Sequence, residues 1–95
     1  RNVYLNPDQR LAALSLYRSL EHARQLVAAG EREAAKIRQA VIDVIAAEPL
    51  AVIDYVELYT YPDLEPVQRL EGATLLALAV KIGQTRLIDN TILEV

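Results

Sequence analysis

The sequence predicts an α+β domain in which a helical hairpin packs on a small antiparallel sheet. Three observations lead to this fold class. Apolar residues recur at helical spacing on both sides of Gly30, β-branched and aromatic residues become frequent after Pro49, and a turn at Gly83 separates two apolar segments near the end. With 95 residues, the chain is long enough for one small domain with a single core.

The first helix is predicted to begin at Asn6, whose side chain suits an N-cap. Pro7 fits the first helical position, and Gln9 stands three residues after the cap, as a capping box requires. Gly30 is expected to end the helix because glycine adopts the left-handed conformation of a C-terminal cap.

One face of this helix is predicted to be apolar. Its residues recur at spacings of three and four, and Leu14 and Tyr17 are expected to widen the stripe. The recurring residues are Leu16, Leu20, Ala23 and Val27.

A second helix is predicted to start at Glu31 and Glu33, where negative charge suits the helix dipole. Pro49 should end it. The very short link around Gly30 predicts that the two helices are antiparallel neighbours. The apolar stripe of the second helix consists of Ala34, Ile37, Val41, Val44 and Ile45.

Three strands are expected after Pro49. In the first, 52–60, Val56 and Leu58 are expected to face opposite sides, so that both faces of the strand would be partly covered. The two prolines in 61–66 predict a loop there. The apolar run in 73–80 could be a buried helix, but the turn at Gly83 favours a strand. That turn predicts an antiparallel hairpin with a third strand from residue 86 to about 93.

The residues that could carry chemistry are few. His22 is a lone imidazole on a helix, for which a structural or solvent-facing role is favoured over a metal site. Asp54 and Glu57 should point to opposite faces of their strand unless a bulge intervenes, so they are not expected to act as an acid–base pair. The charged segments 31–33 and 36–38 are interpreted as a solvated helix face.

Arg86, Asp89 and Asn90 form a polar cluster in an otherwise apolar strand. They could bind a ligand, satisfy strand ends, or pair with Asp54 across the sheet, and the structural roles are favoured. The residues by themselves therefore predict no catalytic group and no metal ligand.

Composition narrows the function classes. Ten basic and thirteen acidic residues give a net charge of −3, which does not suit nucleic-acid binding. No apolar run reaches the roughly 20 residues that span a bilayer, and the start of the chain lacks a signal-peptide pattern. The absence of cysteine excludes disulfides and thiolate metal sites within this sequence. We expect a cytoplasmic protein without nucleic-acid or membrane partners.

Three segments together resemble the C-terminal domain of the pantoate–β-alanine ligase family, the pantothenate synthetases. They are Arg1-Asn2-Val3-Tyr4-Leu5, Asp54-Tyr55-Val56-Glu57 and Arg86-Leu87-Ile88-Asp89-Asn90, in this order, with the loop Pro62-Asp63-Leu64-Glu65-Pro66 between the last two. The chain has no starting methionine and opens within a family motif, so we expect it to be one domain of a longer enzyme.

The resemblance implies a two-step ligation. ATP, accompanied by magnesium, activates the carboxylate of pantoate as an acyl-adenylate, and the amine of β-alanine then displaces AMP to give pantothenate. It implies that an N-terminal Rossmann-like domain, with a His-rich nucleotidyltransferase motif, holds the nucleotide and pantoate sites. Residues 1–95 would be the C-terminal lid domain of this two-domain ligase. By itself this domain is expected to be inactive and to hold no cofactor.

The resemblance implies one nucleotide-binding residue, Arg1. The family binds phosphate through Ser-Ser-Arg-Asn at the join between domains, and this sequence carries only the Arg1-Asn2 half. A guanidinium at that place can neutralise charge that develops on the triphosphate. No other catalytic or metal residue is carried over. The alternative hypothesis is a non-catalytic module that binds another protein through its sheet edge or its helical hairpin.

Overall fold

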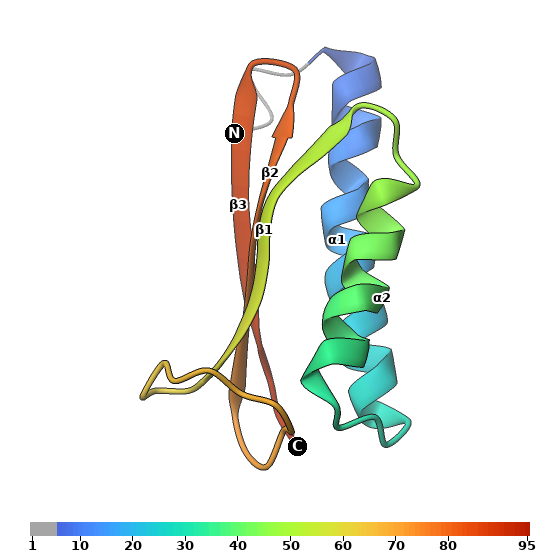
Figure 1. The fold of residues 1–95 in the computed structure, drawn as a ribbon. Coiled ribbons are helices and arrows are strands. Elements are labelled where there is room, and N and C mark those ends of the chain that lie inside the picture. Colours follow the sequence, from blue (N-terminus) through green and yellow to red (C-terminus); the bar gives the residue numbers. More distant parts are fainter. Residues whose placement is uncertain (1–5) are drawn as a thin grey trace.

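The computed structural model describes residues 6–95, which form two layers (Figure 1). One layer is an antiparallel pair of helices, α1 (Pro7–Ala28) and α2 (Ala34–Ala46). The other is an antiparallel sheet of three strands in the order β1-β2-β3, with bounds Ala51–Thr60, Thr74–Ile82 and Thr85–Leu93. Both helices cover the same face of the sheet. The predicted fold class and all five elements are confirmed.

The start and the end of α1 follow from local sequence. The Gln9 N–H donates to Asn6 Oδ1 over 2.8 Å, and the Asn6 N–H donates to Gln9 Oε1 over 3.1 Å, which completes the capping box. After the helix, Gly30 has φ +106°, and the Glu31 N–H donates to the Leu26 carbonyl over 2.9 Å. This backbone pattern is the Schellman motif that glycine makes accessible.

The predicted apolar stripe of α1 is correct at its centre and wrong at its margin. Leu16 and Leu20 are buried, but Leu14 is 45% and Tyr17 is 62% exposed. At 3.6 residues per turn, Leu14 lies about 160° around the helix from Leu16. Because the sheet and α2 both lie on the inner side of α1, only the inner arc is covered. The margin residues therefore stay exposed.

The second helix begins later than expected. Glu33 is only its N-cap residue and makes no side-chain capping bond. The preceding segment is held extended, since the Ala34 N–H donates to the Gln68 carbonyl and the Leu70 N–H donates to the Arg32 carbonyl, over 2.9 and 2.8 Å. A segment that bridges to residues 68–70 cannot be helical, and this tertiary contact delays the start of α2. The helix ends at Ala46, ahead of Pro49.

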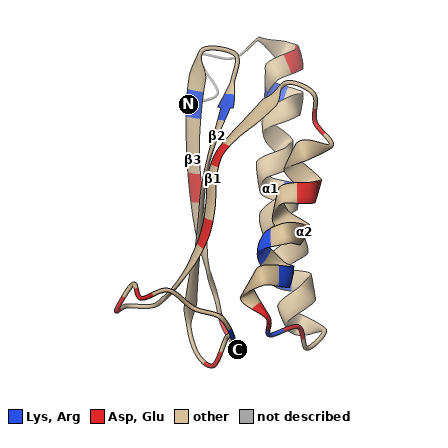
Figure 2. Cartoon of the chain, in the orientation of Figure 1, with Lys and Arg blue, Asp and Glu red and all other residues tan. Residues whose placement is uncertain are grey.

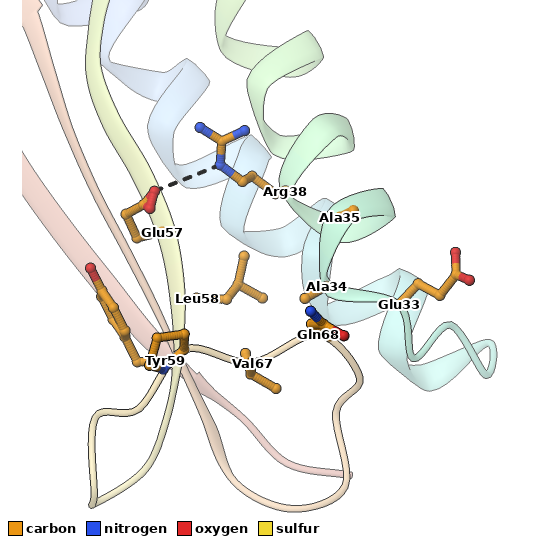
Figure 3. A pocket seen from close by; sticks show the side chains of 10 residues that line it. Glu33, Ala34, Ala35, Arg38, Glu57, Leu58, Tyr59, Val67 and Gln68 are labelled. Atoms are coloured by element: carbon orange, nitrogen blue, oxygen red, sulfur yellow. Dashed lines mark ion pairs between the residues drawn. The ribbon is translucent and has the colours of Figure 1, made fainter.

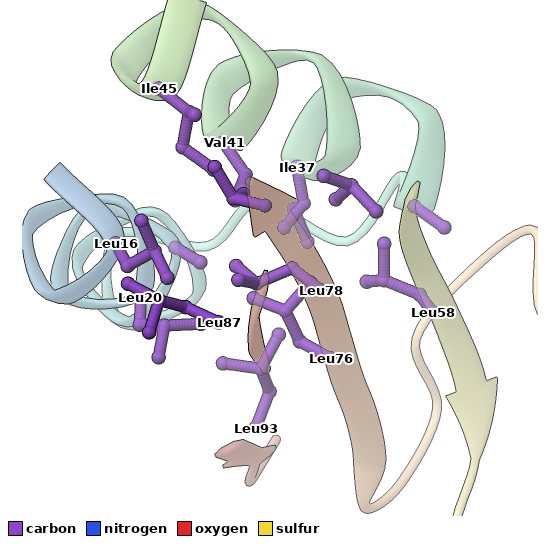
Figure 4. Close-up of a cluster of buried hydrophobic side chains, with 14 of the residues drawn as sticks. Leu16, Leu20, Ile37, Val41, Ile45, Leu58, Leu76, Leu78, Leu87 and Leu93 are labelled. Atoms are coloured by element: carbon purple, nitrogen blue, oxygen red, sulfur yellow. The ribbon is translucent and has the colours of Figure 1, made fainter. Parts of the chain in front are cut away.

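The core lies between the helices and the sheet (Figure 4). The expectation that Val56 and Leu58 face opposite sides is wrong: both are buried on the helix side, because residues two apart on a strand share a face. Val44 is only half-buried. The largest fully buried side chains of the helices and of β2 are Ile37, Val41, Ile45, Leu76, Leu78, Val80 and Ile82.

Substitution of Gly83 in the β2–β3 turn should destabilise the fold. Its φ is +64°, and a Cβ there would collide with the Gln9 carboxamide. We expect Gly83→Ala to lower the free energy of unfolding by about 1–3 kcal/mol. Gly72→Ala is the control, because no heavy atom would lie within 4 Å of its Cβ. Urea denaturation of both variants checks this, and equal shifts of the two midpoints would contradict it.

Candidate functional site

A groove of about 740 Å³ lies at the free edge of β1 (Figure 3). It lies between the start of α2, the second half of β1 and the segment 66–68. Its volume is in the range of small-molecule sites. The lining is mostly apolar and includes no Ser, Cys or His; it consists of Glu33, Ala34, Ala35, Arg38, Glu57, Leu58, Tyr59, Pro66, Val67 and Gln68.

Arg38 is the principal polar group of this groove. Its Nε donates to the Val56 carbonyl over 2.7 Å and lies 3.9 Å from Glu57 Oε1. Both side chains of the ion pair are partly exposed, so the pair is worth only about 0–1 kcal/mol. The hydrogen bond occupies a carbonyl on an edge strand, which would otherwise be open to pairing. The groove can therefore hold a small apolar group beside a guanidinium, and each of its two carboxylates, Glu33 and Glu57, is ion-paired with a basic side chain.

Arg86 and Asp54 form a second polar pair, across the sheet. The Arg86 Nε donates to Asp54 Oδ2 over 2.9 Å, and the guanidinium carbon lies 5.9 Å from the centroid of the Tyr55 ring. The β1 register shifts between Ile53 and Tyr55, so a bulge does intervene next to Asp54. Asp54 and Glu57 nevertheless pair with different arginines. The pairing of Arg86 with Asp54, one of the alternatives that the sequence left open, is confirmed.

The polar cluster near the end of the chain does not converge on one point. Asp89 Oδ1 accepts a hydrogen bond from the Asn90 N–H over 2.8 Å. Because neighbours on a strand point to opposite faces, the side chains of Asp89 and Asn90 diverge, and so do those of Asp89 and Arg86. Asp89 lines a smaller hollow of about 260 Å³ between α1 and β3. The three residues therefore do not form a binding site together.

Two structural arginines lie in segments that the sequence assigned to a solvated helix face, and their roles were missed. Arg38 ties α2 to β1, as described above. Arg32 donates from Nη1 to the Val27 carbonyl over 2.8 Å and so satisfies a group at the end of α1. Neither role could be inferred from local pattern, because each partner belongs to another element. Figure 2 shows basic and acidic residues interspersed over both layers.

The nucleotide-binding prediction, Arg1, lies outside the described residues. His22 is half-buried on α1. Within residues 6–95 no three His, Cys, Asp or Glu side chains lie together as metal ligands. No helix in this part of the chain has the length and apolar character needed to cross a bilayer.

Comparison with known proteins identifies the family, which the geometry of the described residues does not. The model of the family described as pantoate-beta-alanine ligase matches residues 1–92. A pantothenate synthetase from Pelotomaculum thermopropionicum is 68% identical over 93 residues, which cover 98% of this chain and 33% of that protein. One from Heliobacterium modesticaldum is 53% identical over 95 residues, which cover 100% of this chain and 34% of the relative.

The fold has a counterpart among solved structures. The crystal structure of pantothenate synthetase from Thermus thermophilus superposes with a TM-score of 0.86 at 30% sequence identity. The match covers 95% of this chain and 32% of that one. The chain thus spans about a third of the length of the curated relatives that it matches.

Proposed function

Because the chain belongs to the pantoate–β-alanine ligase family, we propose that it is the lid domain of an ATP-dependent ligase that joins pantoate to β-alanine. The match of the family model to residues 1–92 carries this proposal. The described residues form a packed domain without assembled acid–base machinery, which fits a cover better than a complete enzyme. The proposed partner is a Rossmann-like domain in the remaining two-thirds of the ligase.

The proposed reaction has two steps. A carboxylate oxygen of pantoate attacks the α-phosphorus of ATP, which forms the acyl-adenylate and releases pyrophosphate. The amine of β-alanine then attacks the acyl carbon; the bond to AMP breaks, and the ammonium proton is lost as the amide forms. An acyl-adenylate is sensitive to water. A closing lid would exclude water while the second substrate reacts.

Within this scheme Arg1 is the proposed nucleotide contact. The support is its place in the Arg1-Asn2 segment, which matches half of the family's phosphate-binding stretch. A guanidinium can donate two parallel hydrogen bonds to phosphate oxygens and offset the charge that builds up during adenylation. The described residues offer no metal cluster, so we assign magnesium to the nucleotide and the partner domain. Because ATP is available in the cytoplasm, we propose a cytoplasmic location for the ligase.

We expect the 95-residue chain alone to release no AMP above background when it is given ATP, magnesium, pantoate and β-alanine. The reaction needs three bound molecules in one preorganised site, and this chain supplies one proposed contact. The same sequence within the full-length ligase should release AMP and form pantothenate.

A reaction without β-alanine is the control, since AMP release in the full-length ligase should depend on the amine. Turnover by the isolated chain would contradict the lid proposal. No pantothenate from the full-length polypeptide would contradict the ligase proposal and favour the non-catalytic interaction module.

A further inference from the structure

Two buried serines lie on one face of α1. Ser15 and Ser19 are four residues apart, so their side chains are neighbours on the helix surface. Ser15 is 4% exposed, and Ser19 is fully buried. A buried hydroxyl normally has a hydrogen-bond partner, because removing it from water without a replacement bond is unfavourable. The two serines differ in whether the protein supplies such a partner.

Ser19 is satisfied within its own helix. Its Oγ donates to the Leu16 carbonyl over 2.7 Å, a bond that serine often makes to the preceding turn. Ser15 Oγ is buried as well, but it has no hydrogen-bond partner within residues 6–95. Among the buried side-chain oxygen and nitrogen atoms of this range, it alone lacks one. The hydroxyl of Ser15 therefore requires a partner from outside the described chain.

A small hollow between α1 and the end of α2 adjoins this hydroxyl. Its volume is about 110 Å³, and its lining consists of Ser15, Arg18, Val44, Ala47 and Glu48. An ordered water needs roughly 10–15 Å³ of room for its centre and two to four polar partners. Pockets for drug-sized ligands measure about 300–1,000 Å³, so this hollow is too small for one. Its size suits water.

The end of α2 provides hydrogen-bond acceptors beside the same hollow. The last four carbonyls of a helix have no partner inside it. Here the Ala47 N–H donates to the Asp43 carbonyl over 3.2 Å. The Glu48 N–H donates to the Ile45 carbonyl over 3.0 Å. No backbone N–H after the helix, in the described part of the chain, donates to the Val44 carbonyl. A hydroxyl on α1 and a carbonyl on α2, both without partners, thus belong to residues that line one hollow.

We propose that this hollow is a binding site for an ordered water molecule that links α1 to α2. The water accepts a hydrogen bond from Ser15 Oγ and donates one to the Val44 carbonyl oxygen. Such a bridge is nearly as favourable in enthalpy as a direct hydrogen bond. Arg18 is exposed and Glu48 is only half-buried, so water can enter from that side. The site does not depend on the proposed function.

A crystal structure of the full-length protein, at a resolution that shows ordered waters, tests the proposal. One water oxygen should lie about 2.5–3.0 Å from both Ser15 Oγ and the Val44 carbonyl oxygen. The structure of Ser15→Ala should lack this water, because its donor on α1 is gone. Ser19→Ala is the matched control: it removes a buried hydroxyl from the same face of α1, and it should keep the water.

Three results would overturn the proposal. Ser15 Oγ could donate instead to the Leu11 carbonyl four residues earlier, with no water bound, which is the way many helical serines are satisfied. A protein side chain could fill the hollow. Finally, a water that stays in place in Ser15→Ala would not be held by the hydroxyl. The structure of the unaltered protein decides between the first two results and the proposal, so the test does not depend on the folding of a variant.

Discussion

Arg1→Ala in the full-length ligase is expected to slow adenylate formation by about 10²–10³-fold, which corresponds to roughly 3–4 kcal/mol of transition-state stabilisation. The reason is the loss of a preorganised donor to charge that develops on the phosphates. The adenylation rate of Arg1→Lys should lie between the rates of the unaltered ligase and of Arg1→Ala. Lysine keeps the charge but loses the planar fork that binds two oxygens at once. Single-turnover measurement of pyrophosphate release gives the rate, and thermal unfolding of each variant gives its stability.

Arg18→Ala is the matched control for Arg1→Ala. Arg18 is exposed on α1, and its removal should leave the adenylation rate unchanged and alter stability by less than about 0.5 kcal/mol. Unaltered adenylation by a folded Arg1→Ala variant would show that Arg1 is not a phosphate ligand. A parallel loss of rate and melting temperature would point instead to a structural role for the Arg1-Asn2 segment.

Leu78→Ala is expected to cost about 3–5 kcal/mol of unfolding free energy, the upper range for a buried leucine. Leu78 is fully buried in the middle of β2, the central strand, where the sheet meets the helix layer. Small domains have only about 5–15 kcal/mol in total, so the variant should be near the limit of folding. Urea denaturation of the isolated chain, followed by circular dichroism, measures the change.

Leu11→Ala serves as the control, since Leu11 is an exposed leucine in a helix and its truncation should cost less than about 0.5 kcal/mol. The unaltered chain should unfold in one cooperative transition. A similar midpoint for Leu78→Ala and Leu11→Ala would refute the assignment of the core. A gradual melt of the unaltered chain would mean that the domain depends on its partner for folding.

The elements that could be located well from the sequence are those whose physics is local. Asn6, Pro7 and Gln9 set the start of α1 through bonds within four residues of one another. Gly30 and Gly83 mark two places where the backbone takes positive φ, and the sequence predicts a chain reversal at both. The choice of strand over helix for β2 depends on the turn at Gly83, and it is confirmed.

The wrong expectations concern faces and boundaries that other elements decide. Leu14 and Tyr17 have the composition of a core stripe, but they line an open hollow between α1 and β3 and stay exposed. The segment before α2 has a helical pattern, yet it bridges to residues 68–70. The error on Val56 and Leu58 is different in kind, because strand periodicity alone places residues two apart on one face.

For the candidate site, the sequence alone indicates the family resemblance and the nucleotide-binding residue Arg1, because a motif is defined by the order of its residues. The role of Arg1 stays a prediction. The pairing of Arg86 with Asp54 was one of several alternatives, and the structure selects it by bringing β1 and β3 to either side of β2. Arg38 was missed altogether, since its partner Val56 is 18 residues away and offers only a backbone carbonyl.

The sequence by itself determined the fold class, the order of the elements, the capped start of α1 and the family. Helical and strand periodicity, caps and glycine turns depend on neighbours in the chain, so they can be read without coordinates. Only the tertiary structure decided which residues at the margins of the apolar stripes stay exposed, where α2 begins, which ion pairs form and that one face of the sheet is left open. Burial and pairing are set by residues distant in sequence, and a one-dimensional pattern does not contain their distances.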